Sequence, residues 1–113
     1  MDYEETIVGI IAFSGSAHSC AMEAIGLAKQ RKFDEAATLI DQARESLVEA
    51  QKIHGAILSE SIADQKGTPL LTVHAEDQIM TAFVAIGMAC KFIDTYKVIF
   101  DLTDEVAALK NGR

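Results

Sequence analysis

Tryptophan is absent from this chain, and proline, cysteine and aromatic residues are scarce. The 113 residues contain one proline and two cysteines, and aromatic residues make up 6% of the chain although 50% of it is hydrophobic. Strands favour β-branched and aromatic side chains, whereas alanine, leucine and glutamate favour helices. The composition argues against a sandwich or barrel and predicts an all-α protein with a single domain, residues 1–113.

Basic residues are also few. Ten Lys and Arg stand against seventeen Asp and Glu, which gives a formal net charge of -7. Nucleic acids and anionic membrane surfaces both require a basic face on the protein that binds them. We therefore expect no nucleic-acid partner, and expect protein partners with basic patches.

The two cysteines, Cys20 and Cys90, lie in apolar patterns without a Cys-x-x-Cys motif. They predict two buried thiols in a reducing compartment rather than a thiolate metal site, and a disulfide between them is the alternative. The N-terminus lacks a signal-peptide pattern, and no apolar run approaches the length of a membrane span. We expect a cytoplasmic protein without direct membrane insertion.

Apolar residues recur at helical spacing along most of the chain. They predict helices over residues 3–31, 34–64 and 69–97 in an antiparallel, up-down-up bundle, with a tail over 98–113 that either continues the third helix or folds back. The expected seam of the first helix is Ile7, Ile11, Ser14, His18, Ala21, Ile25 and Ala28. That of the second is Phe33, Ala36, Ile40, Ala43, Leu47, Ala50, His54, Ile57 and Ser61.

Small residues at 14–16 suggest a close approach of a neighbouring helix. A polar turn over 64–67 separates the second and third helices, and the third is predicted to start with Thr68 as its cap and Pro69 as its first residue. From Ala82 to Ile93 the only charged residue is Lys91. A helix that is apolar all round must be covered on all sides, so we infer that the third helix is also buried against another subunit.

His74 and Asp77 are three residues apart and share one face of the third helix. A neutral imidazole can attack phosphorus or bind a metal, and the alternative is a core histidine satisfied by its neighbours. Asp77 is expected on a buried seam. If that seam follows an oligomer axis, its copies converge and require a cation, whereas an exposed acid that favours the helix dipole is the alternative.

Three histidines, each predicted on the inner face of a different helix, suggest a tri-histidine metal site. They are His18, His54 and His74. Nothing in the spacing matches their heights, so separate core histidines are the simpler interpretation.

Residues 73–81 read Val-His-Ala-Glu-Asp-Gln-Ile-Met-Thr. This resembles the signature of the lactose/cellobiose-type enzyme IIA of the bacterial phosphoenolpyruvate-dependent sugar phosphotransferase system, approximately Val-His-Ala-Gln-Asp-His-Leu-Met-Thr. Residues 15–19, Gly-Ser-Ala-His-Ser, resemble the family's Gly-(Asn/Asp)-Ala-Arg-Ser, and Phe33 to Ala36 resemble its Asn-Phe-x-x-Ala. The resemblance covers roughly residues 5–97.

The resemblance implies a homotrimer of three-helix chains that acts in the uptake of a β-glucoside, cellobiose or lactose-type sugar. His74 would accept a phosphoryl group on Nε2 from the histidine-containing phosphocarrier protein and pass it to a cysteine of the IIB component. Asp77 would gather with its copies around a divalent cation, Mg²⁺, at the trimer axis.

The sequence departs from the family pattern around the proposed site. Gln78 stands where the family has a second histidine, and Gln51 and His54 replace the His and Gln of a helix-2 motif. These three are the predicted supporting residues, and His18 replaces an arginine. The departures leave open a non-catalytic helical interaction module or a regulatory paralogue of the family.

Overall fold

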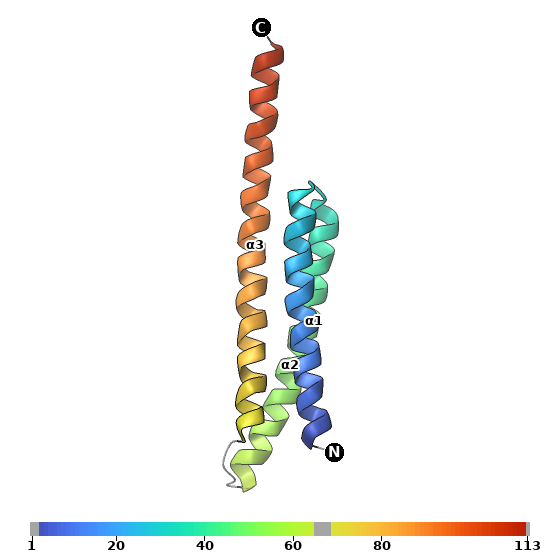
Figure 1. Ribbon diagram of the computed structural model, residues 1–113, viewed down its shortest axis with the longest axis vertical. Helices are drawn as coiled ribbons and strands as arrows, with labels where there is room; N and C mark the ends of the chain where they lie inside the picture. The colour runs from blue at the N-terminus through green and yellow to red at the C-terminus, as the bar shows by residue number, and fades with distance from the viewer. Residues whose placement is uncertain (1–2, 65–68, 113) are drawn as a thin grey trace.

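Three helices make up the computed structural model, which describes residues 3–64 and 69–112, with the side chains of 3–60 and 69–112. They are α1 (Tyr3–Lys29), α2 (Phe33–Asp64) and α3 (Leu70–Asn111), and the described residues contain no strand. The helices run up, down and up, with α1 and α2 side by side and α3 alongside them (Figure 1). The predicted all-α antiparallel three-helix bundle is confirmed.

The turn between α1 and α2 is only three residues long. α1 ends at the basic Lys29, and the first turn of α2 contains the acidic Asp34 and Glu35. A positive charge is favourable at the negative C-terminal end of the helix dipole, and negative charges are favourable at its positive N-terminal end. Arg31 has a positive φ of 65°. The amides of Arg31 and Lys32 donate to the carbonyls of Ala28 and Leu27. These bonds close the end of α1 and reverse the chain. α1 ends two residues before the predicted 31, and α2 begins one residue before the predicted 34.

The core is built largely from alanine and isoleucine. α1 contacts both other helices, and α2 and α3 contact each other less extensively. Small side chains let the helix backbones approach closely, so methyl groups and the isoleucine side chains fill the interior. The buried hydrophobic residues are Ile7, Ile10, Ala17, Ala21, Ala24, Ala28, Ala36, Ile40, Ala43, Leu47, Ala50, Ile57, Ala75, Ile79, Ala82, Ile86, Ala89 and Ile93.

The predicted seam of α2 is largely confirmed, with the side chain of Ser61 outside the described residues. That of α1 is wrong at three positions: Ile10, Ala17 and Ala24 are buried in place of Ile11, His18 and Ile25. His18 is exposed, and Ala17 is buried in its place. One residue turns the side chain by about 100° around a helix, and an alanine there avoids burying an imidazole without partners. Of the small residues at 14–16, Ser14 is the one that is buried against the neighbouring helices. Gly15 does not contact a neighbouring helix, since a Cβ placed on it would meet nothing within 4 Å.

Cys20 and Cys90 are free thiols, so the alternative of a disulfide is not formed. Both are half-buried, and the predicted full burial is wrong. Each lies at the edge of the core cluster, one residue away from a buried alanine of its own helix.

α1 is long and apolar enough to cross a membrane by length and composition alone. Its 27 residues have a mean hydropathy of 1.2 over the most apolar window, so the expectation that no apolar run approaches a membrane span is wrong. The core helix of a soluble protein meets the same criterion, and α1 buries seven residues within the bundle.

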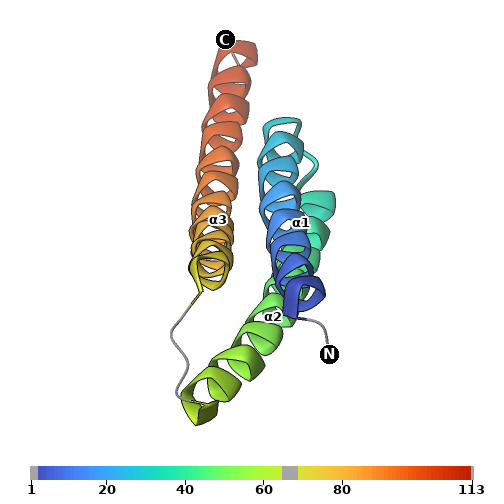
Figure 2. The ribbon, with the colours of Figure 1, turned by 60° about the horizontal axis from the view of Figure 1, so that its bottom comes forward.

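The chain after residue 97 continues α3 without a break, so the predicted helix end at 97 is wrong. No glycine or proline occurs from Phe92 until Gly112, whose amide donates to the carbonyl of Ala108 and closes the helix. This distal part of α3 projects past the α1–α2 turn (Figures 1 and 2). It makes the molecule 74 Å long and only 18 by 16 Å across. We call residues 98–111 the arm.

Candidate functional site

The N-terminal end of α3 carries the candidate site. Pro69 has φ −62° and ψ 149° and is the cap residue, so the helix begins at Leu70, one position later than predicted. The amides of Thr72 and Val73 donate to the carbonyl of Pro69, and no side chain caps the helix. The predicted cap Thr68 and the turn at 65–67 lie outside the described residues.

His74 projects from the second turn of α3 and is exposed. Neither of its ring nitrogens has a hydrogen-bond partner among residues 3–64 and 69–112. With Leu70, Leu71, Val73 and Asp77 it lines an open hollow on the surface. The imidazole is therefore exposed among aliphatic side chains, without a hydrogen-bond partner in the described part of the chain, and it is not a core histidine.

Asp77 is exposed in the single chain, so its predicted place on a buried seam within the bundle is wrong. The buried face of α3 instead consists of Thr72, Ala75, Ile79, Ala82, Ile86, Ala89 and Ile93. Asp77 lies on the opposite side of the helix, between the exposed Val73 and Met80. Its carboxylate has no hydrogen bond or ion pair within the described part of the chain.

His54 joins α2 to α3 through Glu76. The His54 Nε2 and Glu76 Oε1 atoms are 2.8 Å apart, and both side chains are partly buried. Glu76 and His74 are two residues apart on α3, which turns their side chains about 200° from each other around the helix axis. His54 therefore meets the flank of α3 that faces away from His74 within the same chain.

The tri-histidine site is not formed. The described residues contain no group of three His, Cys, Asp or Glu side chains placed to hold one metal ion. His18 is exposed on α1, and His54, on α2, contacts Glu76 on the flank of α3 that faces away from His74. The apolar spacing of each helix predicted that its histidine faces inward. In α1 and α3 the inner face is instead lined largely by alanines, and His18 and His74 are exposed.

The remaining predicted supporting residues, Gln51 and Gln78, are exposed and half-buried, respectively. No hydrogen bond joins either of them to His74 among the described residues. Gln78 is one helical turn beyond His74 and so is its neighbour on the surface of α3. Their supporting role stays a prediction.

Two links that hold this end of α3 were not foreseen from the sequence. One is the His54–Glu76 pair, and the other is a hydrogen bond between the hydroxyls of Tyr3 and Thr72. Tyr3 and Thr72 are 69 residues apart, so no local spacing could have indicated their contact. In the sequence, His54 stood out as a polar residue within the apolar stripe of the second helix, but that pattern could not indicate Glu76 as its partner.

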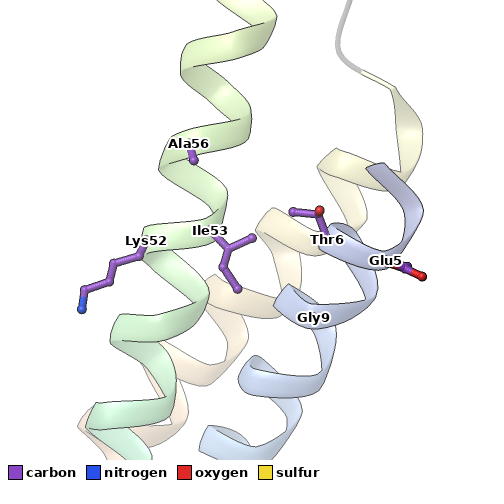
Figure 3. Close-up of a pocket in the computed structure, with 6 residues that line it drawn as sticks. All are labelled: Glu5, Thr6, Gly9, Lys52, Ile53 and Ala56. Carbon is purple, nitrogen blue, oxygen red and sulfur yellow. The ribbon is translucent and has the colours of Figure 1, made fainter. Parts of the chain in front are cut away.

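A separate hollow lies between α1 and α2 and is lined by Glu5, Thr6, Gly9, Lys52, Ile53 and Ala56. Figure 3 shows Ile53 and Thr6 turned into this space, whereas Glu5 and Lys52 point away from it. None of the candidate site residues lines it. Its interior is aliphatic and carries no group suited to acid–base or nucleophilic chemistry.

Comparison with known proteins gives this geometry a context. Residues 5–97 match the family model of the lactose/cellobiose-specific IIA subunit of the phosphotransferase system. The chain belongs to this family. The matched span contains α1 except for Tyr3 and Glu4, all of α2, the His74 site and α3 up to Lys97, so it stops just short of the arm.

Relatives in the IIA family are similar over most of the chain. The N,N'-diacetylchitobiose-specific IIA component of Escherichia coli (strain K12) is 32% identical over 97 residues, which cover 85% of this chain and 84% of that protein. The lichenan-specific IIA component of Bacillus subtilis (strain 168) is 33% identical and covers 87% of this chain and 90% of its own.

Solved structures of IIA components share the fold. The cellobiose-specific enzyme IIA from Bacillus anthracis has a TM-score of 0.79 and 36% identity, and the match covers 89% of this chain and 94% of that one. The IIA component for N,N'-diacetylchitobiose from Escherichia coli, solved in complex with HPr, has a TM-score of 0.81 and 30% identity over 88% of this chain and 97% of its own.

Proposed function

We propose that this protein is a phosphocarrier that takes a phosphoryl group onto His74 and passes it on in sugar uptake. The single observation that carries the proposal is the imidazole of His74, exposed and unbonded among the described residues, at the one place where the chain reads Val-His-Ala-Glu-Asp. Similarity to a IIA component solved in complex with HPr supports HPr as the donor, and a cysteine of the IIB component is the acceptor we propose.

The chemistry requires little of the protein beyond positioning. The Nε2 lone pair of neutral His74 attacks phosphorus in line, the N–P bond of the donor phosphohistidine breaks, and the phosphoryl group moves with its charge. In the second step a cysteine thiolate of the IIB component attacks, and the N–P bond to His74 breaks as the S–P bond forms. The first step releases the imidazole of the donor histidine and the second releases the imidazole of His74, so the phosphoryl group is transferred without a net gain of protons by His74.

Docking of both partners is the task of the surface around His74. Leu70 is 84% exposed, and Leu71 and Val73 are partly exposed beside it. Side chains on a helix lean toward its N-terminus, so the His74 ring lies over this aliphatic turn. We propose that these three residues form the contact with the histidine-containing phosphocarrier protein, HPr, and then with IIB.

The phosphoryl group on His74 would be repelled by Asp77 one turn away unless that carboxylate is neutralised. A single carboxylate per chain is too little to hold a metal ion, but oxygen ligands from three copies suit Mg²⁺. Asp77 fits this role because it is exposed, has no partner among the described residues and lies between Val73 and Met80 on the outward side of α3. The ion would supply charge neutralisation at the axis of a homotrimer, without taking part in transfer.

The outward face of α3 supports assembly of copies. Large apolar side chains on it are 52–57% exposed, which a lone domain would leave in water. They are Met80, Phe83, Val84 and Met88. We propose that this face is the trimer interface, that the protein acts in the cytoplasm, and that the sugar is of the cellobiose, chitobiose or lactose type, recognised by the membrane component.

Phosphorylation in a reconstituted system tests the proposal. The native protein is incubated with phosphoenolpyruvate, enzyme I and HPr, and acid-labile phosphate is measured by intact-mass spectrometry at neutral pH. We expect one phosphoryl group per chain in the native protein and none in His74→Gln. His18→Gln is the matched control, since His18 is an exposed helical histidine. Equal labelling of His74→Gln and the native chain would refute the proposal.

The same phosphorylation assay distinguishes a phosphocarrier from a non-catalytic or regulatory paralogue of the family. Such a protein would bind HPr or IIB without accepting phosphate, although all donors are active on a control IIA protein. Gln78 in place of the family histidine is the residue that separates this member from the pattern. Gln78→His should therefore leave His74 labelling intact and change only its rate.

A further inference from the structure

The arm at the end of α3 is not explained by the phosphocarrier site. Residues 98–111 lie beyond the matched family span and extend past the α1–α2 turn as a continuous helix (Figure 1). Its large apolar side chains are 45–72% exposed: Val98, Ile99, Leu102, Val106 and Leu109. A helix of this length without a partner would leave that surface in water.

The apolar residues of the arm follow a heptad pattern. Counting back from Leu109, apolar residues or threonine recur alternately three and four residues apart, at Val106, Leu102, Ile99, Thr95, Phe92 and Met88. A repeat of 3.5 residues, rather than the 3.6 of a straight helix, is the spacing that packs one helix along another in a left-handed coiled coil. Ile99 and Val106 form one line of the seam, and Leu102 and Leu109 form the other.

The other side of the arm's base is already occupied by its own chain. The Arg31 guanidinium donates two hydrogen bonds of 3.0 Å to the Asp104 carboxylate, and its carbon lies 4.3 Å from the centre of the Phe100 ring. Phe100 also packs against Phe33 and Tyr96. Phe100 and Asp104 lie on the side of the helix away from Ile99, Leu102 and Val106. The intrachain contacts thus fix the arm to the α1–α2 turn and leave the heptad seam facing outward.

Charges beside the seam favour a second copy in parallel. In the heptad, Glu105 and Lys110 occupy the flanking positions that pair between parallel neighbours, Glu105 of one helix with Lys110 of the next. An antiparallel pair would instead place like charges together. Neither residue has an ion-pair partner among the described residues of its own chain. Complementary flanks and a self-matching seam are what a parallel coiled coil of identical helices needs.

We propose that the arm is a self-association segment, whose occupant is the arm of another copy of this chain, packed in parallel as a short coiled coil. The segment adds a clamp at the end of the molecule distant from His74. It does not depend on phosphoryl transfer or on a metal ion. It extends along α3 the association that the outward face of Met80 and Val84 supports.

Sedimentation equilibrium of the full chain in EDTA tests the clamp, because the chelator removes any contribution from a cation. The test variant is Leu102→Glu with Val106→Glu, which places charges in the seam. The matched control is Ala107→Glu with Ala108→Glu, which adds the same charge on the side away from it. We expect the test variant to weaken association by at least about tenfold and the control to stay near native. Equal behaviour of the two, or a native chain that is monomeric, would overturn the proposal.

Disulfide trapping tests the parallel register. In a background with Cys20→Ala and Cys90→Ala, Leu109→Cys places a thiol in the seam, and Ala108→Cys places one outside it. Parallel arms bring the two Leu109→Cys thiols within bonding distance, so mild oxidation should link copies through residue 109 and far less through 108. Equal or absent linkage at both sites would contradict the proposal. Labelling of His74, measured on the same variants, reports separately on the proposed function.

Discussion

The Nε2 atom of His54 lies 2.8 Å from a carboxylate oxygen of Glu76 and so joins α2 to the turn of α3 that carries His74. α2 and α3 contact each other less than either contacts α1, so this bond is one of few polar links between them. It fixes the rotation of the first turns of α3. Because Glu76 and His74 point to opposite flanks, holding Glu76 inward keeps His74 turned out to solvent.

Loss of the His54–Glu76 bond should destabilise the bundle modestly. We expect Glu76→Gln and His54→Gln each to lower the free energy of unfolding by about 1 kcal/mol, the usual size for a partly buried hydrogen bond. The double variant should lose little more than either single one, since both remove the same bond. Urea unfolding measures all three. Glu23→Gln, on an exposed acid of α1, controls for charge and should be near neutral.

The buried hydroxyl of Ser14 should destabilise the folded protein. Its Oγ is buried and has no hydrogen-bond partner among the described residues. A buried polar group without a partner costs about 1–3 kcal/mol, so Ser14→Ala should raise the free energy of unfolding. Ser16→Ala makes the same chemical change at an exposed site of the same helix. The difference between the two isolates the buried group, and a negative difference would show that Ser14 is hydrogen-bonded in solution.

The Arg31–Asp104 pair should give the stability of the arm a dependence on acid pH. The Arg31 side chain, chiefly through its hydrogen bond, lowers the pKa of Asp104 below its ordinary value of 3.8. A carboxyl group with a lowered pKa in the folded protein stabilises it at pH above the ordinary value, and the contribution is lost as the pH falls through the folded pKa. The hydrogen bond to Asp104 raises the pKa of Arg31 above its ordinary value, so Arg31 stays charged and its contribution is constant through the acid range.

Asp104→Asn should therefore lower the protection of arm amides against hydrogen exchange at pH 6–7, and its effect should shrink steadily as the pH falls below 3.8. Hydrogen exchange followed by mass spectrometry of peptides from the arm measures this. Asp94→Asn, an exposed acid of α3 without an ion pair among the described residues, is the control. If the two variants lost equal protection, the Arg31–Asp104 pair would not be what holds the arm.

Glycines inside α1 leave room for stabilising substitutions. A Cβ on Gly26 would meet nothing within 4 Å, and one on Gly9 would lie 3.8 Å from Ile53 Cδ1 in the hollow of Figure 3. Glycine in a helix interior costs about 1 kcal/mol relative to alanine. We expect Gly26→Ala to gain up to about 1 kcal/mol and Gly9→Ala to gain at least as much, because its methyl group also contacts Ile53. A loss at Gly26 in thermal unfolding would indicate that another copy covers that face.

Much of the fold could be predicted from local signals. The line of Ala36, Ile40, Ala43 and Leu47 predicted the buried face of α2 because a 3.6-residue period leaves one interpretation. The α1–α2 turn was predicted within three residues of its place, because the apolar period breaks between the first two helices. The helical period gave the wrong buried residue at His18. Both Ala17 and His18 fit the spacing, and the pattern alone does not say which of the two faces the core.

The candidate site was predicted in part. His74 and Asp77 were identified by residue type and order, and both lie on exposed surface at the start of α3. The His54–Glu76 bond was missed because its partners come from different helices, and their contact depends on how α2 and α3 rotate against each other. Asp77 was placed on a buried seam because an apolar helix has no clear inner face in its sequence.

By itself the sequence determined the helical class, a chain reversal between the first two helices, the candidate residue His74 and the resemblance of roughly residues 5–97 to a family. Each of these depends on neighbours in the chain or on residue type. Only the tertiary structure decided which face of α3 is buried, that His54 turns away from His74, and that the last residues project as an arm held by Asp104. These depend on which of several equally apolar faces packs, and packing is settled by contacts between residues far apart in the chain.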